Sequence, residues 1–310
     1  MLKNIAKAAL KAMVQRFPWG ANEAIFEALY KRMGPEQILA RCMPALDHMQ
    51  LCATGEYGLM QSALNDGLIL PAYARTGIYE PRLAELFRNF FARHGGGTYL
   101  DIGANIGLTT IPVARDPAVH CLAFEPDPVN NRNLRANVKR NCPNHNVTVH
   151  EVALFSRSAT LDFAKDAWNL GDHYLSPHGH STRPTIQVEA APLDQFRDDV
   201  TGAVAAKIDT QGAEPFVIAG GREVLSHVGL LAIEFCPYRM RTLGSDPDVV
   251  LDFLSTFARL AVGTVKGDDL PAFRPAADAL SELRSFIATS REGDSDYRDV
   301  FAVRDDEVRV

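Results

Sequence analysis

The chain has 310 residues, of which 46% are hydrophobic and 23% are charged. This is ordinary globular composition, and it excludes disordered, collagen-like and disulfide-scaffold proteins. The formal net charge is −6, which disfavours a broad electrostatic grip on nucleic acid. The charge is unevenly divided, because residues 1–98 carry a net charge of +3 and the remainder carries −9. A basic first third and an acidic rest predict two parts with different roles.

The cysteines and the apolar segments bear on the cellular compartment. The number of cysteines is odd and no CxxC motif occurs, so neither a zinc site nor a disulfide framework is expected, and a reducing, cytoplasmic compartment is favoured. No uncharged run reaches the ~20 residues that a membrane-spanning helix needs. Lys7 and Lys11 also interrupt the stretch where a secretory signal requires its apolar segment. The cysteines are Cys42, Cys52, Cys121, Cys142 and Cys236.

The first part of the chain is expected to be a helical N-terminal cap over residues 1–76. Residues 2–17 have apolar side chains at helical spacing with basic residues between them. Such a helix either contacts an anionic membrane peripherally or packs on its own domain with its lysines in solvent, and the second arrangement is the more common. Further helices are expected over 21–33 and 35–49, followed by a hairpin or loops over 56–79.

Residues 77–310 are expected to form the second domain. A helix over 80–94 ends at three glycines, and from Thr98 onward short strands alternate with helices. This alternation predicts an α/β, doubly wound, mostly parallel Rossmann-like sheet with helices on both faces. Strands are expected over 98–102, 120–124, 147–154, 159–164, 185–190, 205–209, 230–235 and 299–304, and helices over 107–115, 127–141, 214–220, 247–260 and 276–288.

A glycine-containing loop follows the first strand of this domain, reading Asp101-Ile-Gly-Ala-Asn-Ile-Gly107. Gly103 allows a tight turn and close approach of a ligand, and Gly107 allows close packing where the next helix begins. Asn105 stands where a dinucleotide fingerprint requires its middle glycine, which contacts a pyrophosphate. The loop therefore favours a ligand without a pyrophosphate.

The next two strand ends extend this ligand site. Glu125 follows the second strand, 24 residues after Asp101, where a carboxylate accepts hydrogen bonds from a ribose diol. The third strand ends near Glu151, Val152 and Ala153, where an adenine would stack on apolar side chains. Together these features predict an adenosine-type ligand with a short polar tail, such as S-adenosylmethionine.

The motifs occur in the order typical of a known family. The segment Thr98–Gly107 resembles the opening motif of FkbM-type S-adenosylmethionine-dependent methyltransferases. The resemblance covers about residues 77–240. It continues in Phe124-Glu-Pro126, the asparagines spaced along 133–141, Val152-Ala-Leu154, Lys207-Ile-Asp-Thr-Gln-Gly-Ala-Glu214 and Ile233-Glu234. The chain departs from the family pattern at Gln211, where a glutamate is usual.

The resemblance implies a class I O-methyltransferase that acts on a hydroxyl of a sugar, a glycolipid or another small molecule. It also implies roles for individual residues. Glu125 would hold the ribose. Asp101, Gly103, Asn105 and Gly107 would surround the methionine part of S-adenosylmethionine, and Glu151, Val152 and Ala153 would border the adenine.

Methyl transfer to oxygen needs a group that positions a hydroxyl and removes its proton. Asp209, at the end of a strand beside the expected sulfonium, is the first candidate, and its alternative role is to cap the following helix. His173 is the second candidate, because a loop with His173, His178 and His180 could supply a base at neutral pH. These histidines with Asp172 are also a weaker metal candidate, and no metal is expected.

Three other functions remain open at this stage. A non-catalytic S-adenosylmethionine-binding module fits the departure at Gln211, an NAD-dependent oxidoreductase or epimerase is disfavoured by Asn105, and a nucleic-acid methyltransferase is disfavoured by the net charge. The expected partner is a small-molecule or glycan acceptor, with no nucleic acid. The basic first part makes an anionic or membrane-linked glycan a reasonable acceptor.

Overall fold

The computed structural model describes residues 7, 10, 50–176, 181–263, 270–291 and 296–304. The helices expected over 21–33 and 35–49 lie outside the described residues. Of the expected helix over 2–17, only Lys7 and Leu10 are described, and both are helical. Within the described ranges, no helix combines the length and the apolar character needed to cross a bilayer.

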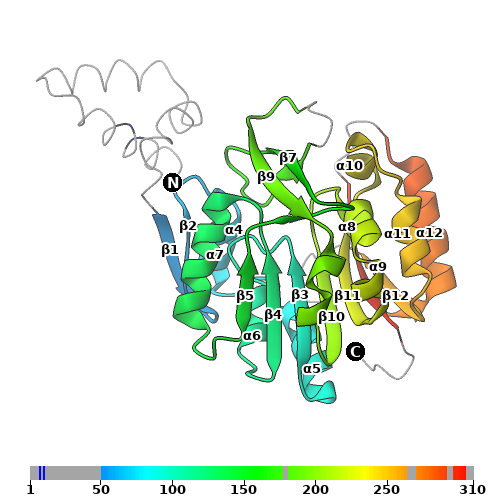
Figure 1. Cartoon of the computed structure of the whole chain (residues 1–310), viewed down its shortest axis with the longest axis horizontal. Coiled ribbons are helices and arrows are strands. Elements are labelled where there is room, and N and C mark those ends of the chain that lie inside the picture. The colour runs from blue at the N-terminus through cyan, green and yellow to red at the C-terminus, as the bar shows by residue number, and fades with distance from the viewer. Residues whose placement is uncertain are drawn as a thin grey trace, which may run out of the picture.

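The described residues contain a central eight-stranded sheet (Figure 1). In chain order its strands are β3 (Gly97–Ile102), β4 (Val119–Phe124), β5 (Val147–His150), β10 (Ala203–Ile208), β11 (Val228–Phe235), β12 (Arg259–Gly263), β13 (Arg274–Pro275) and β14 (Arg298–Val303). Their spatial order is β13-β12-β14-β11-β10-β3-β4-β5. Strands β5, β4, β3, β10 and β11 are parallel, whereas β14 runs antiparallel between β11 and β12.

This strand order has one topological switch point. From β3 the chain proceeds through β4 and β5 on one side, and it later returns to β10 and β11 on the other side. Strands β3 and β10 are therefore hydrogen-bonded neighbours whose following loops diverge. The topology confirms the predicted doubly wound, Rossmann-like sheet.

Helices cover both faces of the sheet, as the alternation predicted. One face carries α4 (Ile69–Thr76), α5 (Pro81–His94) and α6 (Thr110–Ala114), and the other carries α8 (Glu214–Gly220), α9 (Arg222–Ser226), α11 (Asp248–Leu254) and α12 (Ala276–Thr289). Neighbouring residues of β3 enter different cores, since Tyr99 packs with the first group and Leu100 with the second. A strand buried on both faces is typical of a parallel sheet.

Local signals set the ends of two helices that border the site. Helix α5 begins at Pro81 and ends at Gly95, which adopts a left-handed conformation with φ of 71°. Helix α7 (Pro128–Asn141) begins after Asp127, whose carboxylate accepts hydrogen bonds from the backbone N–H groups of Val129 and Asn130. The helix expected over 107–115 is shorter than predicted, because it begins only at Thr110.

The prediction of one strand over 147–154 is wrong. Strand β5 ends at His150, and Ala153–Leu154 forms β6 in a second, four-stranded sheet. That sheet also contains β7 (Ala159–Ala164), β8 (Tyr174–Leu175) and β9 (Thr185–Ala191), and Figure 1 shows β7 and β9 above the carboxyl edge of the main sheet. An apolar run does not reveal that the chain leaves one sheet to pair in another, because that pairing is with β9, distant in sequence.

Residues 50–76 are not a separate helical cap. They form a hairpin, β1 (Gln50–Gly55) and β2 (Gly58–Ala63), followed by α4. Tyr57 and Tyr73 of this stretch are buried in the same core as Phe87 of α5 and Tyr99 of β3. The described part of the expected cap therefore packs into the core of the main domain, and the boundary at residue 76 stays a prediction.

Asparagines along α7 join the hairpin to the glycine loop. Asn137 is fully buried, and its Oδ1 accepts a hydrogen bond from the backbone N–H of Gln61 at 2.8 Å. Its Nδ2 donates to the backbone carbonyls of Gln61 and Ile106, each at 2.9 Å. Asn133 similarly accepts from the side chain of Gln61. The spaced asparagines thus have a structural role in this fold.

Replacing Asn137 with alanine is expected to lower the free energy of unfolding by about 3 kcal/mol. The substitution leaves three backbone groups of the hairpin and loop without their partner, and a buried unsatisfied polar group costs about 1–3 kcal/mol. Chemical denaturation measures the change. Arg132→Ala, on the exposed side of the same helix, is the control and should alter stability by less than about 0.5 kcal/mol. Equal effects of the two substitutions would contradict this role of Asn137.

Candidate functional site

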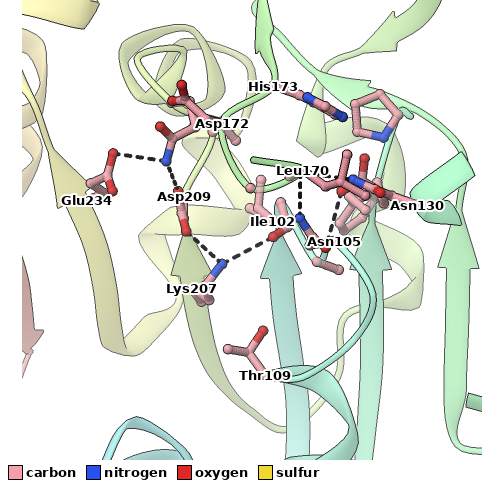
Figure 2. A pocket seen from close by; sticks show the side chains of 18 of the residues that line it. Ile102, Asn105, Thr109, Asn130, Leu170, Asp172, His173, Lys207, Asp209 and Glu234 are labelled. Atoms are coloured by element: carbon pink, nitrogen blue, oxygen red, sulfur yellow. Dashed lines mark hydrogen bonds and ion pairs between the residues drawn. The ribbon is translucent and has the colours of Figure 1, made fainter. Parts of the chain in front are cut away.

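A cavity of about 500 Å³ opens at the carboxyl ends of β3, β4 and β10 (Figure 2). This is the topological switch point, where open α/β sheets bind their ligands. Its walls come from the loop after β3, the end of β4, the segment between β5 and β6, the chain between β7 and β8, and the ends of β10 and β11.

The glycine loop is shaped by close contact with the neighbouring strand. Gly103 has φ of 83°, and a Cβ on it would lie 1.9 Å from the backbone oxygen of Asp209. Asn105 adopts φ of 51°, and its Nδ2 donates to the carbonyl of Leu170 at 2.8 Å. Gly103 and Asn105 line the cavity. Gly107 does not, and instead allows Leu134 of α7 to pack against the loop.

Asp101 lies beneath the glycine loop and stabilises the residues that follow it. It is fully buried, and its Oδ2 accepts hydrogen bonds from the hydroxyls of Thr109 and Thr110 at 2.8 and 2.6 Å. Its Oδ1 lies 3.8 Å from Nζ of Lys207, and the residue is outside the cavity wall. The resemblance implied contact with the methionine part of a cofactor, which this placement does not support, because Asp101 is covered by the loop that it stabilises.

Glu125 ends β4 and faces the cavity from a buried position. Its Oε2 accepts from the backbone N–H of Asn105 at 2.9 Å, and its Oε1 accepts from the backbone N–H of Asp127 at 2.8 Å. Burial raises the pKa of Glu125 to about 8, and the nearby carboxylate of Asp127 contributes in the same direction. Glu125 therefore connects the glycine loop to the residue that precedes α7, and its own carboxyl group lies at the cavity wall.

The apolar rim expected after the third parallel strand is present in part. Val152 and Ala153 line the cavity together with Leu154. Glu151 is exposed and outside the cavity wall, so its expected contact with an adenine is not supported by this placement. The chain reverses between the two sheets at this point, and the reversal leaves the Glu151 side chain in solvent.

A chain of charged and polar groups lies at the ends of β10 and β11 (Figure 2). Nζ of Lys207 is 3.4 Å from Oδ2 of Asp209 and donates to the carbonyl of Gly103. Nε2 of Gln211 donates to Oδ1 of Asp209 at 2.9 Å and to Oε1 of Glu234 at 3.2 Å. The amide at position 211 therefore bridges two carboxylates, where a glutamate would place a third negative charge.

The pKa values in this chain of groups follow from burial and charge. Burial lowers the pKa of Lys207, but the charges of Asp209 and Asp101 have a larger, opposite effect. The pKa of Lys207 is therefore raised above its usual value, and Lys207 is a cation. Burial raises the pKa of Glu234 well above its usual value, and the charge of Asp209 adds to this effect. This chain of groups therefore places the Lys207 cation beside a carboxyl group, that of Glu234, whose ionised form is disfavoured.

The contacts of the acidic residues near β10 show which of them remains open to the cavity. Asp209 does not cap α8, which has no side-chain cap. Glu214 holds the preceding turn, because its Oε1 accepts from the N–H and the hydroxyl of Thr210 at 2.8 and 2.9 Å. Arg239, in α10 (Pro237–Thr242), forms an ion pair with Asp172. Asp209 thus keeps a partly exposed carboxylate at the cavity.

His173 lines the cavity, but its imidazole ring is not arranged to accept a proton from a substrate. Its Nδ1 lies 3.0 Å from the backbone nitrogen of Asp166 and accepts that N–H. Burial lowers the pKa of His173 to about 4, so the ring is neutral near pH 7 and its proton is on Nε2. The expectation of a general base at His173 is therefore not supported, since Nδ1, the nitrogen with a free lone pair in this tautomer, already accepts the N–H of Asp166. His178 and His180 lie outside the described residues. Among the residues that are described, no cluster of three or more His, Cys, Asp or Glu side chains could hold a metal ion.

Sequence reasoning missed several side chains of the cavity wall. Tyr79 and Glu80 come from the segment before α5, Tyr297 and Asp299 from the start of β14, and Asn130 from α7. Glu80 adopts φ of 44°, a conformation uncommon for residues other than glycine. Its position directly before Pro81 marked a helix start but gave no sign of a functional site.

Burial raises the pKa of Glu80 to about 7. In the unfolded chain this carboxyl titrates near 4.5, so between these pH values the folded protein binds more protons and loses stability as the pH rises. Glu80→Gln cannot ionise, and we expect it to be more stable than the natural protein at pH 8 by roughly 1–3 kcal/mol, with little difference at pH 5. Thermal unfolding at both pH values tests this, with the exposed Glu85→Gln as the control. A gain for Glu80→Gln that is equal at the two pH values would contradict the assignment.

Parts of this chain are similar to known proteins. The chain is 28% identical over 180 residues to the 2-O-methyltransferase NoeI of Sinorhizobium fredii. This match covers 52% of this chain and 72% of that protein. A methyltransferase FkbM structure from Methylobacillus flagellatus is 14% identical with a TM-score of 0.37, and the match covers 95% of this chain and 58% of that one. An S-adenosylmethionine-dependent O-methyltransferase from Thermotoga maritima is also 14% identical with a TM-score of 0.37, over 82% of this chain and 77% of that one.

A family comparison covers most of the strands and loops that build the cavity. The sequence model of the methyltransferase FkbM domain matches residues 101–261, from the glycine loop to β12. The matched segment is more than half of the chain and includes Glu125, Lys207, Asp209 and Glu234. The chain therefore belongs to the FkbM methyltransferase family, as its sequence motifs predicted.

Proposed function

We propose that this protein is an S-adenosylmethionine-dependent O-methyltransferase that acts on a hydroxyl group of a neutral sugar or a similar polyhydroxylated small molecule. The observation that carries the proposal is the cavity at the switch point, which has the buried carboxyl of Glu125 at one strand end and the open carboxylate of Asp209 at another. The relative with 2-O-methyltransferase activity in its name supports oxygen as the methyl acceptor.

The residues of the cavity fit S-adenosylmethionine. Glu125 and the buried Oδ1 of Asn130, which has no hydrogen-bond partner, supply acceptors suited to a ribose. Val152, Ala153 and Leu154 supply an apolar rim suited to an adenine. When bound, S-adenosylmethionine supplies an activated methyl group on a positively charged sulfur. Gly103 lets the β3 loop and the end of β10 meet closely beneath the site.

We propose Asp209 as the group that accepts the proton of the substrate hydroxyl. Its carboxylate is the open one of this cluster, and Lys207 and Gln211 each hold one of its oxygens without covering both lone pairs. The rest of the task is positioning, because the donor is already activated and the hydroxyl must be held in line with the methyl group.

The charge of the cavity wall supports a neutral acceptor. Asp209, Glu234 and Asp299 line the side of the cavity near β10, β11 and β14, with the phenol groups of Tyr79 and Tyr297. Carboxyl groups and phenols bind sugar hydroxyls. The two cations of the described cavity wall, Lys207 and Arg239, are already paired with Asp209 and Asp172, so neither is free to hold an anionic acceptor. The site itself therefore favours a different acceptor from the anionic glycan suggested by the basic first part of the chain.

The NAD-dependent alternative is disfavoured by the loop geometry. Where a dinucleotide site has a glycine close to the pyrophosphate, this chain has Asn105, whose side chain is fixed to the carbonyl of Leu170. The non-catalytic alternative predicts binding of S-adenosylmethionine with no methyl product. Both alternatives are separated from the proposal by the experiment below.

The test combines binding and transfer. Calorimetry of the full chain with S-adenosylhomocysteine and with NAD is expected to show binding of the first alone. Incubation with S-adenosylmethionine carrying a ¹⁴C methyl group, together with matched glucosides, glucosaminides and glucuronides, is expected to label a neutral sugar at an oxygen. Tight binding of NAD alone would refute the proposal, and preferred labelling of glucuronides would refute the neutral acceptor. Binding of S-adenosylhomocysteine without transfer to any hydroxylated compound would favour the non-catalytic module.

A further inference from the structure

Three polar atoms in the cavity wall are buried without a hydrogen-bond partner. They are Nε2 of His173, Oδ1 of Asn130 and Oδ1 of Asn105. His173 is 7% exposed and Asn130 is 1% exposed, and all three residues line the cavity. Buried polar atoms in folded proteins are normally paired, so an unpaired set around a cavity indicates a ligand that completes the pairing.

The chemical character of each atom is fixed by the rest of its side chain. Nδ2 of Asn105 and Nδ2 of Asn130 both donate to the carbonyl of Leu170, so each Oδ1 is an acceptor. A backbone N–H only donates, and therefore Nδ1 of His173 is the acceptor of the Asp166 N–H. In a neutral imidazole the other nitrogen then carries the proton, which makes Nε2 a donor. The wall offers two acceptors and one donor.

The location of these atoms indicates which part of a ligand they meet. Asn130 lies in the first turn of α7, directly after β4, and Asn105 donates its backbone N–H to Glu125. His173 follows Leu170 by three residues, and the carbonyl of Leu170 accepts hydrogen bonds from the side chains of both Asn105 and Asn130. The apolar rim of Val152–Leu154 and the Lys207–Asp209 pair belong to other parts of the wall. The unpaired atoms therefore gather at the end of β4.

We propose that His173 binds the ribose of S-adenosylmethionine, donating its Nε2–H to a ribose hydroxyl, while the side-chain oxygens of Asn130 and Asn105 accept from the ribose diol. This inference rests on the proposed cofactor and assigns the segment between β7 and β8 to cofactor binding. A vicinal diol supplies two donors and several acceptor lone pairs, and this matches the unpaired set. His173 is then a ligand-binding donor, and Asp209 remains the proton acceptor.

Two conservative substitutions separate the two nitrogens of His173. The Oδ1 of an asparagine side chain lies near the position of Nδ1, so His173→Asn can keep the contact with the Asp166 N–H while it removes the cavity donor. The Nε2 of a glutamine side chain lies near the position of the ring Nε2, so His173→Gln can keep the donor. Calorimetry of the full-length variants with S-adenosylhomocysteine, and with its 2′-deoxy and 3′-deoxy analogues, reports binding independently of any acceptor.

We expect His173→Asn to weaken binding of S-adenosylhomocysteine by about three- to tenfold, the size of one neutral hydrogen bond, and His173→Gln to recover most of the loss. For the deoxy analogue that lacks the contacted hydroxyl, His173→Asn and the natural protein should bind equally. An equal loss with all three ligands, or no loss at all, would refute the ribose contact. If the natural protein does not bind S-adenosylhomocysteine, both this inference and the proposed cofactor fail, whereas loss of methyl transfer with normal binding concerns only the proposed reaction.

Discussion

Replacing Asp209 with asparagine is expected to lower kcat for methyl transfer by about 10²- to 10⁴-fold, the range typical of general base catalysis. The amide has the same shape but cannot accept a proton from a substrate hydroxyl. Its Oδ1 can still accept from Gln211, and Lys207 keeps a second carboxylate, Asp101, at 3.8 Å. The loss should therefore appear in transfer of the labelled methyl group and not in the fold.

Two measurements make this prediction specific. Asp209→Asn should bind S-adenosylhomocysteine within about threefold of the natural affinity, because the carboxylate is assigned to the acceptor and not to the cofactor. Glu234→Gln is the matched variant, since it changes the neighbouring carboxyl that shares Gln211. A rate for Asp209→Asn within threefold of the natural rate would remove Asp209 from the proposed role, and a larger loss in Glu234→Gln would transfer that role to Glu234.

Replacing Gly103 with alanine is expected to lower the free energy of unfolding by roughly 4 kcal/mol. The new methyl group would lie 1.9 Å from the backbone oxygen of Asp209, and the positive φ of 83° is unfavourable for alanine. Backbone strain of this kind costs about 1–3 kcal/mol, and overpacking adds a similar amount. To relieve this clash, the ends of β3 and β10 would have to move apart, and cofactor binding should therefore also be lost.

Gly95 provides a matched control for this substitution. It has a similar positive φ of 71°, but a Cβ at this position would meet no atom within 4 Å. Gly95→Ala should therefore show the cost of the backbone conformation alone, about 1 kcal/mol, with S-adenosylhomocysteine binding unchanged. Denaturant unfolding and calorimetry of both variants test the argument. Equal destabilisation by the two substitutions would mean that the contact with Asp209 is unimportant.

The motifs that carried the functional prediction are local in sequence. The glycine loop, Glu125 and Asp209 each follow a strand, and parallel strands bring their carboxyl ends to one edge of a sheet. Strand–helix alternation was therefore sufficient to place Gly103, Asn105, Glu125 and Asp209 on one cavity. It was not sufficient for Asp101, because whether a side chain at a strand end faces the ligand or the interior depends on the neighbouring strand.

The sequence by itself determined the doubly wound sheet, the family and most of the strand ends, because hydrophobic periodicity and turn residues act over short distances. Only the tertiary structure decided that Glu80 faces the same cavity as Lys207, that Gln211 bridges Asp209 and Glu234, and that residues 50–76 join the main core. The protonated nitrogen of His173 was also decided there, by the N–H of Asp166. Each of these depends on contacts formed by folding, which place a charge or a hydrogen-bond partner beside a side chain, and no local pattern encodes them.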